Sequence, residues 1–408
     1  METFDVAIVG AGHAGAQAAI QLGQLGFAGS IGLIGAEPEL PYERPPLSKE
    51  YLAGQKAFER MLIRPHTFWA ERGVSLVPGS RVASVEAGAK RIETDAGRRF
   101  GYGSLIWAAG GTPRRLACEG CDLPGVHAIR TRADVDAIRA ELGAARRIAV
   151  VGGGYVGLEA AAVMRGLGKE VVLIEALGRL LARVAGPEIS NFYAREHRRR
   201  GVEVRLGASV TAVLERVGRA SGLRLADGSM IEADMVIVGI GIDAAVGPLL
   251  AAGAEGANGV DVDAGCRTGL PDVYALGDCA AQENRFAGGL RLRLESVQNA
   301  HDTAAAAARS VMGLPAAEPT PPWFWSNQYD LRLQTVGLSV GHDATIVRGR
   351  PEEGSFSVVY LLGGRVIALD CVNATRDYAQ GRRLVLEGRR PDLSMLADTA
   401  VPLKELAG

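Results

Sequence analysis

Two segments of the chain share the same order of apolar, small and polar residues. They are VAIVGAGHAGAQAAIQLGQLG, which starts at residue 6, and IAVVGGGYVGLEAAAVMRGLG, which starts at residue 148. Each begins with a continuous apolar run, typical of a buried strand, and continues with small and apolar residues at helical spacing. A second apolar run follows each helical stretch, at residues 30–35 and 171–175. The order strand, turn, helix, strand is therefore predicted twice.

The turns of both segments carry glycines at the same places. The two sets stand 142 residues apart: Gly10, Gly12 and Gly15, and Gly152, Gly154 and Gly157. In a G-x-G-x-x-G turn the first two glycines allow a tight turn and close approach of a pyrophosphate, and the third lets the helix pack on the strand. Free N–H groups at the helix start favour the phosphate charge. The repeat predicts two dinucleotide-binding sites in an α/β protein.

The acid that follows the second strand differs between the two segments. Glu175 ends that strand in the later segment, 23 residues after Gly152 and near the ~20-residue spacing of a ribose-binding acid. A carboxylate there accepts a hydrogen bond from a ribose hydroxyl and repels a 2′-phosphate, so we expect NADH, with Arg179 as the residue that could change this preference. In the earlier segment the equivalent position is Gly35, and Glu37 is the nearest acid. Glu37 is either a ribose ligand or an exposed turn residue.

Three further apolar runs end in small residues, at 105–116, 236–242 and 271–280. The last of them ends in Gly277 and Asp278. An aspartate at a strand end can direct its carboxylate to a ribityl or ribose hydroxyl. A Gly-Asp pair alone is a common turn, but its place after the other runs favours a flavin in the first site.

Composition limits the class of protein. A chain of 408 residues, 48% hydrophobic and 22% charged, is long enough for two or three globular domains. Its net charge of −1 argues against nucleic-acid binding, and no apolar run approaches the ~18 residues that span a bilayer. Five cysteines and no recognisable secretion signal fit a reducing compartment. We expect a cytoplasmic protein that binds neither nucleic acid nor membrane.

Cysteine spacing leaves one alternative open. Cys118 and Cys121 form a C-x-x-C pair, which is found in redox centres and in halves of zinc sites. The chain has no second such pair and no suitably spaced histidine pair, so we predict no metal site. Cys266, Cys279 and Cys371 are interpreted as small core residues.

The segment PYERPPLSKE, residues 41–50, contains three prolines among charged residues. Proline fixes φ and removes a backbone donor, so we predict a stiff, extended connector that is neither helix nor central strand. The connector carries Arg44 and Lys49, and the chain has no cysteine before Cys118.

The order of motifs along the whole chain resembles that of the bacterial FAD-dependent NADH:ferredoxin reductases. The motifs are GAGHAG, RPPLSK, AAGGTPR, GGGYVGLE, VYALGD, ESVQNA and PWFWSNQYD. RPPLSK and WFWSNQYD are specific to this branch, which serves [2Fe–2S] ferredoxins of cytochrome P450 and ring-hydroxylating dioxygenase chains. One departure is Ala109, where the family usually has threonine.

The resemblance implies a glutathione-reductase-like fold with two Rossmann-type dinucleotide-binding domains and an α+β C-terminal domain. The FAD-binding domain would comprise residues 1–111 and 242–318, the NAD-binding domain residues 112–241, and the C-terminal interface domain residues 319–408. A Pro-rich linker, residues 314–322, precedes the last domain. Within that domain we expect strands near 345–350, 356–362 and 365–372 and a helix near 376–388.

In disulphide reductases, the segment that corresponds to residues 41–50 carries the redox-active cysteine pair. Since this chain has none, the resemblance implies that electrons leave the flavin outward. It also implies that Arg44 contacts the FAD phosphates, and that Lys49 lies beside the flavin ring and pairs with Glu159. Trp325 is either a flavin neighbour or an anchor of a domain interface.

The resemblance extends the set of expected cofactor contacts. For FAD they are Gly10, Gly12, His13, Ala14, Gly15, Glu37, Arg44, Lys49, Val82, Ala109, Gly110, Arg130, Gly277, Asp278, Ser296, Val297 and Trp325. For NADH they are Gly152, Gly154, Tyr155, Val156, Gly157, Glu175, Arg183, Gly239, Ile240 and Gly241. The backbone N–H near Val297 would face the pyrimidine end of the flavin, and Lys49, Glu159 and Trp325 would be the catalytic residues.

We therefore predict a ferredoxin–NAD⁺ reductase that passes hydride from NADH to FAD and single electrons to a [2Fe–2S] ferredoxin. The partner would be acidic and dock near the flavin. The run 376–390, with five arginines and two acids, is either its docking surface or a solvated helix face. We expect a monomer or weak dimer. The alternatives are a rubredoxin reductase, a flavin NADH oxidase, and a redox-sensing binder similar to apoptosis-inducing factor.

Overall fold

The computed structural model describes residues 1–316 and 318–407. Residue 317, inside the predicted Pro-rich linker, and residue 408 lie outside the described residues. The chain divides into two compact units. The first unit comprises Met1–Arg44, Phe58–Thr112 and Asp243–Thr320, and the second comprises Pro45–Ala57, Pro113–Ile242 and Pro321–Gly408. The chain passes from one unit to the other after residues 44, 57, 112, 242 and 320, and two of these crossings lie within β7 (Gly111–Pro113) and β16 (Ile242–Ala244).

The first unit is built on a mixed sheet with the strand order β3-β2-β1-β6-β5-β4, and β18 also pairs with β6. Strands β1, β2, β3, β6 and β18 run parallel, whereas β4 and β5 form an antiparallel hairpin against β6. Their bounds are β1 (Glu2–Val9), β2 (Ile31–Ile34), β3 (Val74–Val77), β4 (Val82–Glu86), β5 (Arg91–Thr94), β6 (Arg99–Trp107) and β18 (Val273–Ala275). The apolar runs that predicted β1, β2, β6 and β18 are confirmed as strands.

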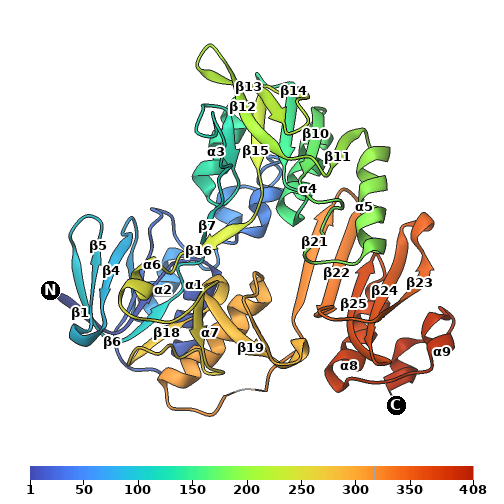
Figure 1. The fold of residues 1–408 in the computed structure, drawn as a ribbon. Helices are drawn as coiled ribbons and strands as arrows, with labels where there is room; N and C mark the ends of the chain where they lie inside the picture. The colour runs from blue at the N-terminus through green and yellow to red at the C-terminus, as the bar shows by residue number, and fades with distance from the viewer. Residues whose placement is uncertain (317, 408) are drawn as a thin grey trace. The chain divides into compact units, whose positions relative to one another are not determined.

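Helices α1 (His13–Gln24) and α7 (Val297–Val311) of this unit lie side by side (Figure 1). Their alanines share one buried cluster, because small side chains let the two backbones approach closely. The other helices and strands of the unit are α2 (His66–Glu71), α6 (Gly247–Ala251), β17 (Val260–Val262), β19 (Ala280–Asn284) and β20 (Leu290–Leu292).

The second unit contains a parallel sheet with the order β11-β10-β9-β15-β8. Its strands are β8 (Val126–Ala128), β9 (Arg147–Val151), β10 (Glu170–Glu175), β11 (Val202–Leu206) and β15 (Met235–Val238). The helices are α3 (Arg132–Glu141), α4 (Tyr155–Gly166) and α5 (Pro187–Arg199). A separate antiparallel sheet consists of β12 (Val210–Arg216), β13 (Arg219–Leu225) and β14 (Met230–Glu232).

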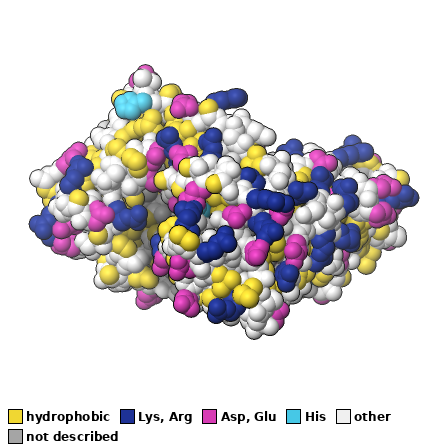
Figure 2. Space-filling model, turned by 90° about the horizontal axis from the view of Figure 1, so that it is seen from above, with side chains coloured by type: hydrophobic (Ala, Val, Ile, Leu, Met, Phe, Trp, Pro, Cys, Tyr) yellow, Lys and Arg dark blue, Asp and Glu magenta, His cyan; other side chains and the backbone are white. Residues whose placement is uncertain are grey.

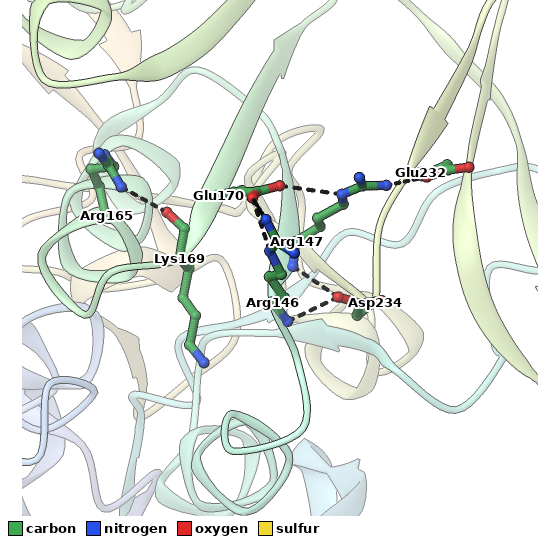
Figure 3. A network of polar contacts seen from close by, with 7 residues as sticks. All are labelled: Arg146, Arg147, Arg165, Lys169, Glu170, Glu232 and Asp234. Carbon is green, nitrogen blue, oxygen red and sulfur yellow. Dashed lines mark hydrogen bonds and ion pairs between the residues drawn. The ribbon is translucent and has the colours of Figure 1, made fainter.

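Ion pairs and backbone hydrogen bonds fasten the amino-terminal edge of this parallel sheet (Figure 3). The Asp234 carboxylate accepts from the backbone N–H groups of Arg146 and Arg147, both at 2.8 Å. Glu170, at the start of β10, accepts from both arginine side chains, and Arg147 also pairs with Glu232. Such exposed pairs contribute only about 0–1 kcal/mol each. The polar cluster at this edge is therefore structural, which leaves the opposite, carboxyl edge for ligands.

The C-terminal part of the second unit is an antiparallel sheet with the order β21-β22-β25-β24-β23. It comprises β21 (Trp323–Gln328), β22 (Leu331–Gly337), β23 (Ala344–Arg350), β24 (Ser355–Leu362) and β25 (Arg365–Val372), with helices α8 (Thr375–Glu387) and α9 (Leu393–Ala397). The predicted strands and helix of this region are confirmed. Tyr360 joins this sheet to α5 of the same unit. Its hydroxyl accepts from the backbone N–H of Gly186, the N-cap residue of α5, at 2.9 Å.

The Pro-rich connector differs from the prediction. Residues Pro45–Ser48 form a turn of 3-10 helix, where we had predicted extended chain throughout. Proline is pre-organised for the first position of a helical turn, because its fixed φ is helical and the missing N–H would have no partner there. No helix within residues 1–316 and 318–407 is both long and apolar enough to cross a membrane.

Candidate functional site

The first glycine-rich turn follows β1, and only glycine fits at two of its positions. Gly10 has φ of +111°, and a Cβ added there would lie 2.2 Å from the carbonyl oxygen of Ala108. A Cβ on Gly15 would lie 1.8 Å from the oxygen of Gly10. The turn therefore brings α1 against the sheet as closely as backbone atoms allow.

The second turn follows β9 and repeats this arrangement. Gly152 has φ of +112°, and its added Cβ would lie 2.3 Å from the oxygen of Gly239. A Cβ on Gly157 would lie 1.9 Å from the oxygen of Gly152.

Neither helix start is capped by its own N-cap side chain. Gly12 and Gly154 are the N-cap residues of α1 and α4, and glycine has no side chain with which to cap its helix. Leaving aside the chain neighbours and the helix backbone, no described atom lies within 4 Å of a Cβ built on Gly154, and the described atoms nearest to a Cβ built on Gly12 belong to the Arg44 guanidinium, at 3.7 Å. Uncapped N–H groups and free space suit a pyrophosphate, so both turns fit a dinucleotide.

The side chains of Tyr42 and Arg44 bind the Glu37 carboxylate beyond the end of β2, and we call this arrangement the side-chain clasp. Arg44 donates to one carboxylate oxygen of Glu37 at 2.6 Å, and the Tyr42 hydroxyl donates to the other at 2.6 Å. Burial alone would lower the pKa of Arg44, but Glu37, Tyr42 and Asp278 outweigh it and raise the pKa. Arg44 thus stays charged beside the N-cap residue Gly12. The interpretation of Glu37 as a mere exposed turn residue is wrong, since it is half-buried and doubly bonded.

Asp278 lies in a turn just beyond the end of β18. Gly277 before it has φ of +65°, and a Cβ there would lie 2.9 Å from the Cβ of Ala14 in α1. Gly277 also donates its N–H to the Thr303 hydroxyl of α7, at 3.0 Å. Two helices thereby fix the approach of Asp278, whose electrostatic influence reaches Arg44. Glu37, Arg44 and Asp278 therefore gather at the carboxyl edge of the first sheet.

Of the other residues predicted to contact FAD, Ala109 and Gly110 lie at the carboxyl edge of the first sheet, next to Gly10 and Asp278. Ser296 caps α7 by accepting from the N–H of Asn299, so its hydroxyl is already engaged just before Val297. Ala109 and Gly110 follow β6, and Gly110 accepts a hydrogen bond from the Cys279 thiol. The rest are Val82, buried at the start of β4; His13, whose ring centre is 6.4 Å from that of His301; and Arg130, which precedes the capping box of α3 in the second unit.

Glu175, at the end of β10, is held by backbone donors. The N–H of Gly153 donates to one oxygen at 2.6 Å, and the N–H of Leu177 donates to the other at 2.7 Å. The carboxylate therefore lies against the glycine-rich turn, where an adenosine ribose is expected. Arg179 points its guanidinium into its own loop, where it donates to the oxygens of Ala185, Ser190 and Ala182. Arg179 is thus committed to the loop, which argues against its use for a 2′-phosphate.

Two arginines flank the small residues after β15. The atom nearest to a Cβ built on Gly241 is a terminal nitrogen of Arg183, at 3.9 Å, followed by Arg114 at 4.0 Å. Gly239 packs on the turn itself: a Cβ added there would lie 3.3 Å from the backbone nitrogen of Gly157. Ile240 lies between them and is half-buried. The sequence had indicated Arg183 as an NADH contact but not Arg114, although Arg114 is the last residue of the motif AAGGTPR.

The first two residues of α4 differ in their surroundings. Val156 is 39% exposed, which leaves an apolar side chain in solvent beside the turn. Tyr155 packs on Phe324 of β21, with ring centres 4.4 Å apart, and burial raises its pKa.

The expected contact between Lys49 and Glu159 is present within the second unit. The Lys49 ammonium lies 2.7 Å from Glu159 Oε2, and the two side chains are 12% and 4% exposed. Ser48 donates to the same oxygen at 2.5 Å, and Ser326 donates to the other oxygen at 2.7 Å. Sequence reasoning missed both serines. Ser326 had a signal, because it is a polar residue inside the aromatic strand motif WFWSNQ.

Trp325 belongs to β21, whose side chains alternate between two faces. Phe324 and Ser326 contact α4, so Trp325 is on the other face with Trp323, and the two indole centres are 5.5 Å apart. Trp325 is half-buried.

The cysteines are all free thiols. Cys118 and Cys121 are half-exposed in a loop beside β12, and burial, with a smaller effect of Cys121, raises the pKa of Cys118. A raised pKa disfavours the reactive thiolate. Within residues 1–316 and 318–407, no three His, Cys, Asp or Glu side chains are grouped as they would be around a metal ion.

Comparison with known proteins agrees with this geometry. Residues 4–304 match the family model of the pyridine nucleotide-disulphide oxidoreductases, and residues 323–407 match the model described as reductase C-terminal. This family implies a flavin and NAD(P) as cofactors.

Relatives match over nearly their whole length. The chain is 60% identical over 407 residues to the 5,5'-dehydrodivanillate O-demethylase ferredoxin reductase subunit of Sphingobium sp. strain NBRC 103272 / SYK-6, covering 100% of this chain and 99% of that protein. It is 57% identical over 402 residues to a ferredoxin–NAD(P)⁺ reductase of Sphingomonas sp., covering 98% and 97%.

Among solved structures, the chain matches the covalent putidaredoxin reductase–putidaredoxin complex with a TM-score of 0.95 and 35% identity, covering 99% of this chain and 98% of that one. The chain therefore belongs to the pyridine nucleotide-disulphide oxidoreductases and, within them, to the ferredoxin reductases.

Proposed function

We propose that this protein is an FAD-containing, NADH-dependent ferredoxin reductase that supplies electrons to a cytochrome P450 or a ring-hydroxylating oxygenase. One observation carries the proposal. Two uncapped dinucleotide turns occur in a chain whose Pro-rich connector contributes a buried Lys49–Glu159 ion pair instead of a thiol. FAD is assigned to the turn at Gly10 and NADH to the turn at Gly152. The FAD-binding, NAD-binding and C-terminal domains are assigned with the boundaries predicted from sequence.

The preference for NADH rests on Glu175 and Arg179. A carboxylate at the end of β10 can accept from ribose hydroxyls, and it repels the negative charge of a 2′-phosphate. The nearby cation that could attract that phosphate is Arg179, which already donates to two backbone oxygens of its own loop and to the Ser190 hydroxyl of α5.

Lys49 and Glu159 are assigned to the hydride-transfer step. A bound flavin supplies an acceptor that takes two electrons as hydride and releases them one at a time. Lys49 provides positive charge where hydride delivery brings negative charge, and Glu159 fixes the position of that ammonium. Trp325 is assigned as a flavin neighbour. A Trp325→Ala variant that folds normally and reduces ferredoxin at the wild-type rate would exclude a role in electron delivery.

An acidic [2Fe–2S] ferredoxin is the proposed partner. Charges of both signs are mixed over the face of the protein that Figure 2 shows, so no broad single-sign field directs docking there. The run on and after α8 is locally basic: Glu387 pairs with Arg383 and Arg389, and Asp377 pairs with Arg348. The exposed Arg376, Arg382 and Arg390 are left to meet a partner's carboxylates. Charge reversal at Arg376 and Arg382 should raise the KM for ferredoxin and leave NADH-driven flavin reduction unchanged.

We further propose a monomer or weak dimer, which light scattering can test.

The experiment that tests the proposal measures NADH-driven cytochrome c reduction by the purified protein, with and without a [2Fe–2S] ferredoxin. Strong dependence on the ferredoxin is the expected result, and rubredoxin in its place should support little activity. Fast NADH consumption with oxygen alone, unaffected by any iron–sulphur protein, would overturn the proposal and indicate an oxidase.

A further inference from the structure

The Glu159 carboxylate is the end of a buried chain of hydrogen bonds within the second unit. Its oxygens accept from Ser48, Lys49 and Ser326, as described above. Ser326 in turn lies 3.2 Å from the side-chain nitrogen of Gln328, two residues further along β21. Both residues are on the face of β21 that contacts α4, because side chains two apart in a strand share a face.

The chain continues into α5. The side-chain oxygen of Gln328 lies 2.9 Å from Nε2 of His197, and Nδ1 of the same ring lies 3.1 Å from the Tyr329 hydroxyl. Ser326 and His197 are 0% exposed and Gln328 is 1% exposed, so water does not compete for these bonds. Only Tyr329, which is half-buried, lies near the surface.

The Glu159 carboxylate determines the position of each proton in this chain of hydrogen bonds. An ionised carboxylate only accepts, so Ser326 must give Glu159 its single hydroxyl proton. The Ser326 oxygen must then accept from the amide nitrogen of Gln328, which leaves the amide oxygen facing His197. A carbonyl oxygen cannot donate, so His197 carries its proton on Nε2, and Nδ1 accepts from Tyr329.

All the bonds therefore run in one direction, from Tyr329 to Glu159. Aligned hydrogen bonds of this kind polarise one another and strengthen the last bond, the one that reaches the carboxylate. His197 suits this arrangement as a neutral ring, since burial lowers its pKa.

Asp370, on β25, shows what happens to a buried carboxyl with fewer donors. Its carboxyl accepts a hydrogen bond from the Tyr360 hydroxyl at 2.7 Å. Burial raises its pKa to about 7. Glu159 is as buried but accepts from two hydroxyl donors and an ammonium, so its oxygens have the polar partners that the Asp370 carboxyl lacks.

We infer that Gln328 and His197 are positioning residues that act through Ser326 to hold the Glu159 carboxylate in the orientation of its ion pair with Lys49. The inference rests on the proposed role of Lys49 and Glu159 in hydride transfer. It adds to that role a dependence on residues that belong to α5 and to the C-terminal sheet and not to either glycine-rich turn.

The first test replaces Gln328 by leucine, which keeps the volume but removes both the donor to Ser326 and the acceptor from His197. Stopped-flow flavin reduction by NADH should slow by about tenfold at saturating NADH, with little change in the NADH dissociation constant or the flavin content. Gln334→Leu is the matched control, because it makes the same change at a buried position of neighbouring β22. An unchanged rate in Gln328→Leu would overturn the inference.

A Glu159→Gln variant separates this inference from the proposed function. If Glu159→Gln is slow and Gln328→Leu is not, the hydride-transfer role stands and the positioning chain is wrong. If Glu159→Gln itself reduces flavin at the wild-type rate, the proposed role of the ion pair is wrong, and so is its dependence on Gln328.

The second test needs no turnover. It observes His197 in the wild-type protein, and a variant serves only to assign the signal. Nitrogen-15 NMR of histidine-labelled protein reports which ring nitrogen carries the proton, and His197→Gln assigns the signal. We expect a neutral His197 with its proton on Nε2 near neutral pH. A proton on Nδ1, or a charged ring, would contradict the direction of the chain and overturn the inference.

Discussion

The two glycine-rich turns have almost the same backbone but different surroundings. Gly10 and Gly152 have φ of +111° and +112°, and both contact a backbone carbonyl from another strand end. Gly12 has the guanidinium of Arg44 above it, whereas Gly154 has open space. In the proposed function the turn provides the phosphate site in each case, and the Arg44 guanidinium adds a fixed cation to the first.

The acids beyond the two turns are held in different ways. Glu37 is bound by two side chains, Tyr42 and Arg44, while Glu175 is bound by two backbone N–H groups of its own nucleotide-binding half. The side-chain clasp ties the first acid to a cation, and the backbone clasp leaves the second acid its full charge for a ribose. This difference suits a flavin dinucleotide that stays bound and a nicotinamide dinucleotide that must leave.

The largest effect should come from adding one methyl group to each turn. Gly15→Ala forces its Cβ against the oxygen of Gly10 and should abolish flavin retention, because the helix cannot approach the strand. Gly157→Ala should keep the flavin and slow its reduction by NADH by about 100-fold, equivalent to about 2.7 kcal/mol. Flavin absorbance and stopped-flow reduction measure the two effects.

The controls for this pair are Gly23→Ala and Gly166→Ala, in the same two helices. An added Cβ meets nothing within 4 Å at either position. Alanine favours a helix over glycine by about 1 kcal/mol, so neither control should lose cofactor. Loss of flavin in Gly157→Ala would reverse the assignment of the two turns.

Arg44 tests the cation that distinguishes the first turn. Arg44→Ala should weaken flavin binding by about tenfold to 100-fold, because it removes a charge beside the phosphate site and leaves Glu37 without its ion pair. Fluorescence of released flavin measures the affinity. Arg99→Ala, which removes an exposed ion pair with Glu93 in the same unit, should leave the affinity unchanged. An equal loss in both variants would mean that Arg44 has no special role.

Glu175 tests the nucleotide preference of the second turn. Glu175→Gln removes the negative charge and should raise kcat/KM for NADPH relative to NADH by about tenfold. Steady-state kinetics with both nucleotides measure the ratio. The same change at Glu37 should not alter it, and a shift there as large as at Glu175 would contradict the assignment of the NADH site.

The smallest effect should come from Tyr42. Tyr42→Phe removes one donor to Glu37 and should lower the free energy of unfolding of the first unit by about 1 kcal/mol. Thermal unfolding followed by flavin release would show a decrease of about 2–4 °C. Tyr102→Phe is the control, because the buried Tyr102 hydroxyl has no hydrogen-bond partner among the described residues, so its removal should not destabilise. A greater loss in the control would show that the clasp contributes little.

The elements near the turns could be predicted because their signals are local. The glycine spacing and the apolar runs indicated β1, α1 and β2 and their counterparts β9, α4 and β10. The connector was predicted less well. Proline excludes a long helix and a central strand, but it is compatible with both extended chain and one turn of 3-10 helix, and the structure has the turn at Pro45–Ser48.

The partners of the buried acids could not be predicted from local signals. Ser48, Lys49 and Ser326 come from segments more than 100 residues away from Glu159 in the sequence. In the sequence, Gln328 and His197 are ordinary polar residues of a strand and a helix. Only the fold brings them into contact. Arg179 was the residue expected to complicate the nucleotide preference. In the structure its guanidinium instead donates to the backbone oxygen of Ala185.

The sequence by itself determined the two dinucleotide turns, since a phosphate-binding turn depends on backbone angles and close approach that only glycine permits at fixed spacing. It also excluded a thiol relay in the segment 41–50, because that segment contains no cysteine. Only the tertiary structure decided which carboxylate meets which donor. A hydrogen bond depends on distances of a few tenths of an ångström between segments that are remote in the chain, and these distances are set by the packing of the whole unit.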